Sequence, residues 1–209
     1  MDVTTIIIVL ISVLLSMTIH EAVHAFAGYL LGDTTAKEEG RLTLNPIAHI
    51  DPVATLAVPV LLAIIGAPIF GAAKPVPFNP ERLRWGDFGA AIVAMAGPLS
   101  NFMLAAIAGL AIRLLQPTDM LFDILMTFTL VNIGFFVFNI IPFPPLDGSR
   151  FLYAVAPEPV KAVMRSIESL GLAAILIFIA IFYVFLQTPF IVTIKAIIEF
   201  LTGVLLVVS

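Results

Sequence analysis

The chain contains long stretches almost free of charged residues, each close to the length that crosses a bilayer. A transmembrane helix needs about 20 mostly apolar residues, because the hydrocarbon core of a bilayer is about 30 Å thick. Six stretches approach this length: residues 4–31, 52–73, 88–112, 124–146, 169–189 and 190–208. Apolar residues make up 61% of the chain and charged ones 11%, against about 45–50% and about 25% in soluble domains. The sequence therefore predicts an all-α polytopic membrane protein with five to six hydrophobic helices.

Charge and cysteine content exclude further classes. The chain has 10 Lys and Arg residues against 14 Asp and Glu residues, for a formal net charge of −4. A nucleic-acid binder needs clustered basic side chains, so we expect the lipid bilayer as a partner and no nucleic acid. Cysteine is absent, which excludes disulfides and thiolate metal ligands. We expect a single domain over residues 1–209, with a core at 4–148 and C-terminal helices at 169–208.

The first apolar stretch contains the pattern H-E-x-x-H, formed by His20, Glu21 and His24. Residues four apart lie on one face of a helix, so both imidazoles can bind one metal ion. Glu21 is then placed beside the metal, where a general base for bound water belongs. Ionisable residues inside a membrane helix are costly and are functional candidates by default. The pattern therefore predicts a hydrolytic zinc site, and a buried polar cluster that joins helices is the alternative.

A hydrolytic zinc ion takes three protein ligands and leaves one position open for water. Because the chain has no cysteine and three histidines, the third ligand is either His49 or a carboxylate near a membrane end. Asp147 is favoured, because the proline-rich residues 141–146 interrupt the helix before it and Gly148 permits a tight turn after it. His49 lies in a polar turn and is the alternative ligand.

Three separated motifs resemble the site-2 protease family of intramembrane zinc metalloproteases. They are H-E-x-x-H at residues 20–24, A-G-P-L-S-N at 96–101 and N-x-x-P-x-x-x-L-D-G at 139–148. Residues 40–52 are also similar to compact prokaryotic members, which implies a chain without PDZ or CBS modules. The resemblance implies that His20, His24 and Asp147 bind zinc and that Glu21 is the catalytic carboxylate.

The resemblance also implies a substrate and residues that contact it. Asn139 would bind the substrate backbone or the developing oxyanion, and Asn101 would bind substrate from a helix packed beside the site. The implied reaction is hydrolysis of peptide bonds within or near transmembrane helices of membrane-protein substrates, in a prokaryotic inner membrane. A substrate helix must unwind first, and residues 32–51 and 71–80 are candidate edges for pairing with the extended segment. The alternatives are an inactive helix-binding member and a metal transporter.

The depth of the predicted ligands constrains the topology. The histidines lie in the C-terminal half of the first helix and Asp147 follows the fourth stretch, so these two stretches must run in the same direction. They do so if residues 52–73 form a re-entrant or broken element, which Pro59, Gly66 and Pro68 permit. We therefore expect a re-entrant or short β element after the first helix. Most Lys and Arg residues then lie on one side, and the positive-inside rule places the active site near the cytoplasmic face.

Overall fold

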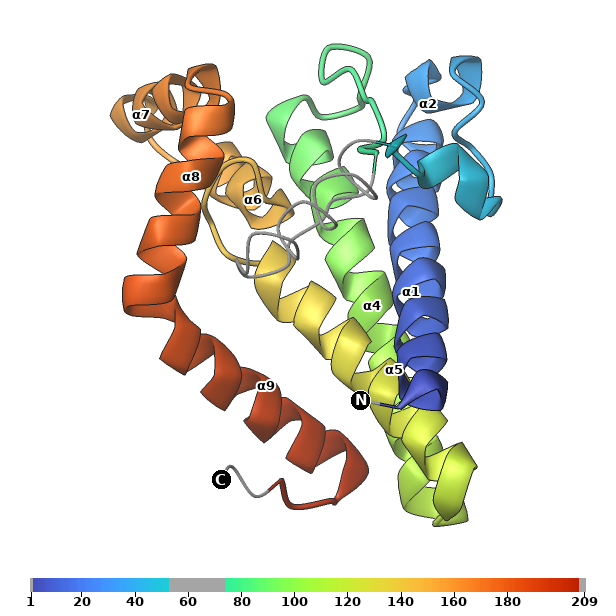
Figure 1. Ribbon diagram of the computed structural model, residues 1–209. Coiled ribbons are helices and arrows are strands. Elements are labelled where there is room, and N and C mark those ends of the chain that lie inside the picture. The colour runs from blue at the N-terminus through green and yellow to red at the C-terminus, as the bar shows by residue number, and fades with distance from the viewer. Residues whose placement is uncertain (1, 53–73, 207–209) are drawn as a thin grey trace.

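The computed structural model describes residues 2–52 and 74–206, which form helices joined by short connections (Figure 1). The long helices are α1 (Val3–Leu30), α4 (Asp87–Leu115), α5 (Asp119–Asn139) and α9 (Gln187–Thr202). The shorter ones are α2 (Thr35–Glu38), η1 (Pro46–His49), α6 (Asp147–Val155), α7 (Glu158–Ser169), α8 (Leu172–Ile181) and the π-helical η3 (Phe182–Leu186). Four helical stretches are long and apolar enough to cross a membrane: α1, α4, α5 and Ala173–Thr202. This confirms the predicted all-α polytopic class.

Most of the last two apolar stretches lies in one continuous helical stretch, residues 172–202. α8 passes through η3 directly into α9, whereas the sequence suggested separate helices at 169–189 and 190–208. Pro189 lies in the first turn of α9, directly after the wider turns of η3, so its missing N–H falls where the hydrogen-bond register already shifts. The described residues therefore contain four membrane-length helices, and residues 53–73 of the second predicted stretch lie outside them.

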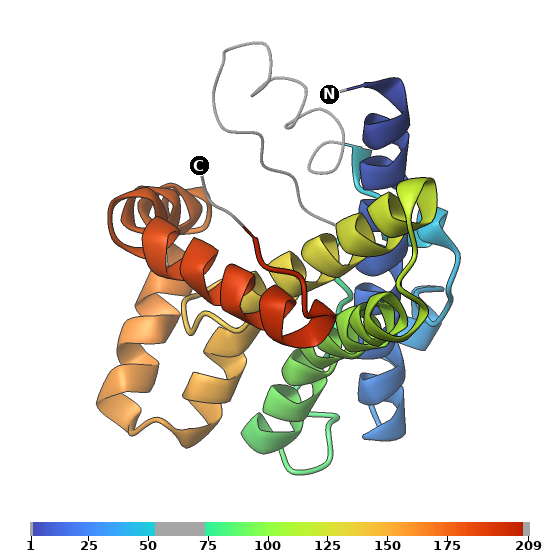
Figure 2. The ribbon, with the colours of Figure 1, turned by 90° about the horizontal axis from the view of Figure 1, so that it is seen from below.

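Helices α1, α4 and α5 pack on one another, and α9 crosses α4 and α5 (Figure 2). The buried contact between α4, α5 and α9 is apolar and consists of Ala105, Ile133, Val137 and Ile198. The contact of α1 with α4 and α5 is different, because polar side chains are buried there. They include His20, Asn101 and Asn132, of which the two asparagines are fully buried. The polar interior of the molecule is therefore concentrated where these three helices meet.

The chain leaves α1 and enters α4 at the same end of the molecule. The backbone N–H of Arg84, just before α4, donates to the carbonyl oxygen of Leu31, just after α1, over 2.8 Å. α4 then runs away from this end and α5 returns toward it, so α1 and α5 run in the same direction (Figure 1). This is the arrangement that a shared site for the histidines and Asp147 requires.

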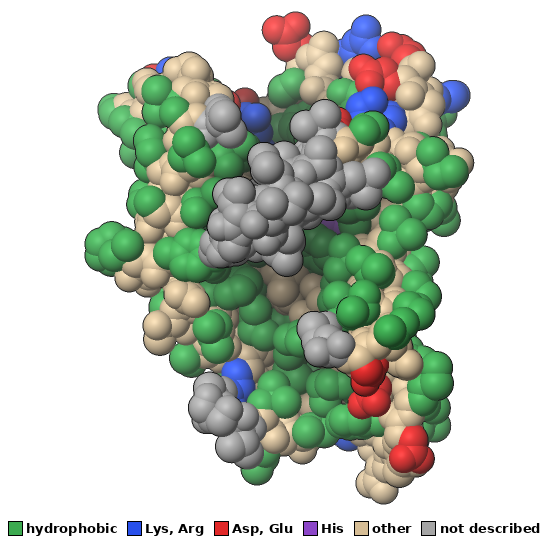
Figure 3. Space-filling model, in the orientation of Figure 1, with side chains coloured by type: hydrophobic (Ala, Val, Ile, Leu, Met, Phe, Trp, Pro, Cys, Tyr) green, Lys and Arg blue, Asp and Glu red, His purple; other side chains and the backbone are tan. Residues whose placement is uncertain are grey.

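On the face seen in Figure 3, charged side chains gather toward the two ends, and the described surface between them is mostly hydrophobic. The connections and short helices at the end formed by α2, α7 and the start of α4 carry most of the basic residues. These are Lys37, Arg41, Lys74, Arg82, Arg84, Arg150, Lys161 and Arg165. Arg113, in the last turn of α4, and Lys195, in α9, lie toward the opposite end. The distribution fits a protein whose sides face lipid and whose ends face water.

The short β element expected after the first helix is not found in described residues 31–52 and 74–86. Two short helical turns, α2 and η1, occupy the first of these segments. Local side-chain hydrogen bonds explain this, because the carboxylate of Asp33 accepts from Thr35 and the amide oxygen of Asn45 accepts from the N–H of Ile47. Such bonds favour turns over strands. A re-entrant element at 53–73 falls outside the described residues.

Asp33 joins the end of α1 to the segment before α4. One of its carboxylate oxygens accepts from the N–H and the hydroxyl of Thr35, and the other accepts from the N–H of Asn79 over 2.6 Å. Burial raises the pKa of Asp33, but the hydrogen bonds from Thr35 and Asn79 lower it more, so the pKa lies below its ordinary value. The ionised side chain therefore stabilises the folded state.

We expect Asp33→Asn to lower the free energy of unfolding at pH 7 by about 1.5–3 kcal/mol, because the buried N–H groups lose a charged acceptor. A carboxyl with a lowered native pKa contributes stability above its unfolded pKa of about 3.9 and loses it as the pH falls further. The difference between wild type and variant should therefore shrink below about pH 4. Unfolding of both proteins in detergent micelles, at pH 7 and again below pH 4, measures this difference. Glu81→Gln, an exposed carboxyl in the same connection, should have little effect, and a constant difference for Asp33→Asn would contradict the assignment.

Candidate metal centre

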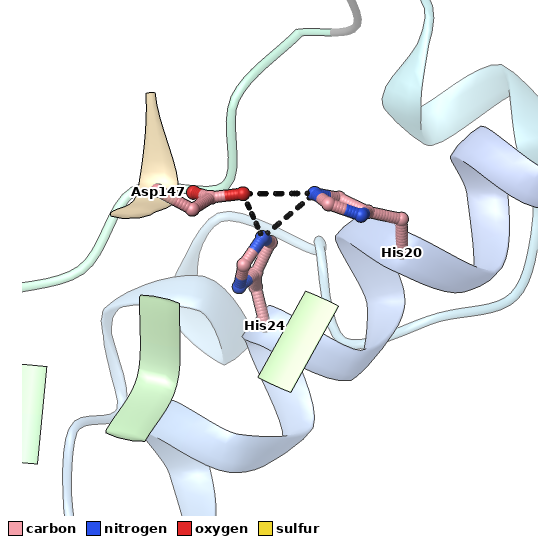
Figure 4. Close-up of side chains that lie close together, drawn as sticks. All are labelled: His20, His24 and Asp147. Atoms are coloured by element: carbon pink, nitrogen blue, oxygen red, sulfur yellow. Dashed lines mark hydrogen bonds and ion pairs between the residues drawn. The ribbon is translucent and has the colours of Figure 1, made fainter. Parts of the chain in front are cut away.

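Three side chains meet where the C-terminal half of α1 faces the start of α6 (Figure 4). Nε2 of His20 and Nε2 of His24 lie 3.0 Å apart, and Oδ2 of Asp147 lies 3.1 Å from the first and 3.3 Å from the second. Both imidazoles are buried, whereas the Asp147 side chain is 24% exposed. Within residues 2–52 and 74–206, this is the group of three His, Cys, Asp or Glu side chains whose ligand atoms can share a metal ion.

The turn between α5 and α6 brings Asp147 to the level of the histidines. The prolines at 142, 144 and 145 prevent α5 from continuing, and α6 begins at Asp147 itself. A carboxylate is stabilised in the first turn of a helix, where backbone N–H groups are unpaired. Gly148 packs so closely on the end of α5 that a Cβ would lie 2.3 Å from the carbonyl oxygen of Ile140. The tight turn therefore depends on a residue without a side chain.

Gly97 allows α4 to pack directly against the ligand atoms. A Cβ at this position would lie 2.3 Å from Nε2 of His24 and 2.8 Å from Nε2 of His20. Both distances are far below van der Waals contact, so any side chain at residue 97 would displace the imidazoles. The motif at 96–101 therefore contributes space to the site.

The far nitrogen of each imidazole faces an oxygen on α4. Nδ1 of His20 lies 2.6 Å from the side-chain oxygen of Asn101, and Nδ1 of His24 lies 2.7 Å from the carbonyl oxygen of Val93. Each Nδ1 therefore carries the proton and donates it, which leaves Nε2 as a lone pair. This is how metal-binding histidines are held in proteins.

The arrangement fits a zinc ion. Two Nε2 lone pairs and a carboxylate oxygen face one another, and three acceptors at such distances repel unless a cation lies between them. Ligands at about 2.0–2.1 Å from a tetrahedral zinc ion are about 3.3 Å apart, close to the 3.0–3.3 Å seen here. Two nitrogens, one oxygen and an open fourth position are typical of hydrolytic zinc sites.

Glu21 lies beside the three ligands and is not one of them. It is 9% exposed, and its Oε2 accepts from the backbone N–H of Val76 over 3.0 Å. Val76 belongs to residues 74–79, a non-helical segment just before α4. The buried Arg41 holds the same segment, because its Nη2 donates to the carbonyl oxygens of Lys74 and Pro75. The predicted base is thus attached to a segment that is itself fixed to the protein.

The remaining predicted site residues, His49, Asn139 and Asn101, differ in where they lie relative to the three ligands. His49 is fully buried and its Nε2 contacts the carbonyl oxygen of Thr43, so Asp147 and not His49 joins the two histidines. Asn139 ends α5, and its amide donates to the carbonyl oxygen of Phe135. Asn101 is fully buried and contacts His20 directly. Roles for Asn139 and Asn101 in substrate binding stay predictions.

Two contributors to the site were not predicted from the sequence. Val93 offers a backbone carbonyl, which every residue has, so no sequence signal points to it. Asn132 bonds to Asn101 over 2.9 Å and is fully buried. An asparagine inside an apolar run was a usable signal, because a buried amide in a membrane helix needs a partner.

Comparison with known proteins finds curated relatives. The chain is 36% identical over 178 residues to the Bacillus subtilis protein named "Putative zinc metalloprotease YwhC", a match that covers 80% of this chain and 77% of that protein. It is 32% identical to proteins named "Putative zinc metalloprotease Rip2" from Mycolicibacterium smegmatis and Mycobacterium tuberculosis. These matches cover 68% and 72% of this chain and 54% and 58% of those proteins. No protein-family model and no solved structure matches the chain.

We expect Gly97→Ala to lower zinc affinity at least about tenfold, because the added methyl group displaces both histidines. Zinc content of the purified protein and competition with a chelator measure the effect. Gly28→Ala is the matched control, since residue 28 lies one turn after His24 and a Cβ there meets nothing within 4 Å. Full zinc retention by Gly97→Ala would show that α4 does not limit the space around the ligands.

Proposed function

Because the chain belongs to the site-2 protease family of zinc metalloproteases, we propose that it is an intramembrane endopeptidase acting on transmembrane helices of other membrane proteins. The observation that carries this proposal is the position of the metal centre. Two of its ligands belong to α1, which is long and apolar enough to cross a membrane. A hydrolytic centre in such a helix acts on peptide bonds at membrane depth, so its substrates are segments that lie there.

His20, His24 and Asp147 would hold the zinc ion, and Glu21 would act as general base and acid. When bound, zinc would lower the pKa of a coordinated water molecule to about 7 and so supply a nucleophile near neutral pH. Oε2 of Glu21 is engaged by Val76, so its other oxygen, Oε1, would accept the proton from water. The same oxygen would then deliver that proton to the leaving amine.

Residues 74–79 would guide the substrate into the site. A helical substrate has its backbone carbonyls paired, so it must unwind before hydrolysis. The N–H groups of Lys74, Val76 and Asn79 already donate within the protein, and Pro75 and Pro77 have none. This segment would therefore hold an unwound substrate by side-on contact and not by strand pairing. Prolines at 75, 77 and 80 favour extended backbone, and Arg41, Glu21 and Asp33 fix this segment beside the ligands. Its rigidity would lower the entropic cost of ordering the substrate.

The two motif asparagines would have different roles. One hydrogen of the Asn139 amide bonds to the carbonyl oxygen of Phe135, and the second is available to donate to a substrate carbonyl or an oxyanion. Asn101 uses its oxygen on His20 and its amide nitrogen on Asn132 and the carbonyl oxygen of Ser16. We therefore propose that Asn101 orients His20 and does not contact substrate.

Glu21→Gln should bind zinc as wild type does and lose cleavage of a transmembrane-helix substrate, because glutamine cannot accept the proton from water. The measurements are zinc content and cleavage of a model substrate in liposomes, with an expected fall of at least about 100-fold. Glu39→Gln, an exposed carboxyl near the same membrane end, should cleave normally. Cleavage by the Glu21→Gln protein at the wild-type rate would remove Glu21 from the mechanism.

We propose a multi-pass protein of a prokaryotic inner membrane, with the metal centre nearer the cytoplasmic side. Eight of the 10 Lys and Arg residues lie at the end where α1 finishes and α4 begins, and the metal centre is in the half of α1 nearer this end. The positive-inside rule assigns that end to the cytoplasm. Four crossings would then place both termini outside.

Single cysteines test this orientation, because the chain has none of its own. Glu81→Cys lies in the connection before α4, and Thr118→Cys lies in the turn between α4 and α5 at the opposite end. A membrane-impermeant maleimide added to intact spheroplasts should label Thr118→Cys and should label Glu81→Cys only after lysis. Labelling of Glu81→Cys in intact spheroplasts would reverse the proposed orientation.

A further inference from the structure

A line of hydrogen bonds leads from His20 through α4 into α5. Nδ1 of His20 lies 2.6 Å from Oδ1 of Asn101, and Nδ2 of Asn101 donates to Oδ1 of Asn132 over 2.9 Å. Nδ2 of Asn132 then donates to the carbonyl oxygen of Phe128, also over 2.9 Å. Both asparagines are 0% exposed and His20 is 6% exposed, so bulk water does not compete for these bonds.

The direction of these bonds follows from their far end. The carbonyl oxygen of Phe128 can only accept, so Asn132 turns its NH2 group toward Phe128 and its oxygen toward Asn101. That oxygen also can only accept, so Asn101 turns its NH2 group toward Asn132 and its oxygen toward His20. The carbonyl oxygen of Ser16 favours the same orientation of Asn101, more weakly because its distance is 3.3 Å.

The orientation of Asn101 determines which nitrogen of His20 can bind metal. An oxygen opposite Nδ1 keeps the proton there and leaves Nε2 as the lone pair that faces His24 and Asp147. If the Asn101 amide were reversed, its NH2 group would face Nδ1 and the proton would move to Nε2. In that tautomer Nε2 cannot bind a metal ion.

We propose that Asn132 is a positioning residue of the metal centre, which acts through Asn101 to hold His20 in its metal-binding tautomer. Asn132 contacts no ligand atom and lies outside the three sequence motifs. The inference rests on the proposed zinc site. It adds the residue that determines which groups donate and which accept in the hydrogen bonds behind His20.

Thr129 shows that a buried polar residue of α5 does not need a partner on another helix. It is fully buried one turn before Asn132, and its hydroxyl donates to the carbonyl oxygen of Leu125 within α5. Asn132 makes the equivalent bond to Phe128 and also reaches across to α4. The bond to Asn101 is therefore what distinguishes Asn132, and Thr129→Val is a matched control.

Asn132→Thr tests the proposal, because a threonine hydroxyl can bond within α5 as that of Thr129 does but is too short to reach Asn101. We expect zinc affinity, measured by chelator competition, to fall about tenfold in Asn132→Thr and about 10–100-fold in Asn101→Leu. The double variant should bind zinc no more weakly than Asn101→Leu alone, since Asn132 acts through Asn101. Thr129→Val should stay within about twofold of wild type.

The ¹⁵N chemical shifts of His20 in the metal-free protein read the tautomer directly. We expect wild type and Thr129→Val to carry the proton on Nδ1, and Asn132→Thr to show a mixture. Asn132→Leu, which fills the volume with an apolar side chain, should behave as Asn132→Thr does. An unchanged tautomer and an unchanged zinc affinity in Asn132→Thr and Asn132→Leu would overturn the proposal. So would a double variant whose loss of zinc affinity equals the product of the two single losses. Wild-type protein that binds zinc but cleaves no substrate would refute the proposed function and leave this test intact.

Discussion

Two imidazole nitrogens and a carboxylate oxygen face one another at 3.0–3.3 Å, with the imidazole protons held on the far nitrogens. Three lone pairs in such contact repel, and a bound cation would relieve this repulsion. The surrounding features maintain this contact. Gly97 leaves space beside the imidazoles, and Gly148 lets the turn before α6 bring Asp147 to them. The packing of α1 against α4 and α5 thus brings the parts of the metal centre together.

The direction of the helices determines where the chemistry takes place. Because α1 and α5 run in the same direction, the second half of α1 meets the turn after α5. Residues 74–79 lie against the same place, fixed by Arg41, Asp33 and Glu21. A substrate segment that reaches the zinc site from the membrane would meet rigid, non-helical backbone there.

Local patterns predicted the parts of the site that a single helix contains. His20, Glu21 and His24 could be assigned from the sequence because helical geometry alone places them together. Asp147 required elimination and a topological argument, and His49 stayed an alternative until the fold excluded it. Of the two forms expected after the first helix, a strand does not occur in described residues 31–52 and 74–86, because Asp33 and Asn45 bond locally and favour turns. The final helix was divided wrongly at Pro189, since the π-helical turns of η3 accommodate the proline.

The sequence by itself determined the membrane class, the length of the main helices, the zinc-binding face of α1 and the identity of its candidate base. These depend on hydropathy and on helical periodicity, which act over one turn or one span. Only the tertiary structure decided that Asp147 joins the two histidines, that Gly97 leaves them space and that Asn101 and Asn132 form the line of hydrogen bonds behind His20. Those relations join residues 31 to 127 positions apart. They are set by how helices pack, because a side chain's partner across an interface is not encoded in the residues next to it.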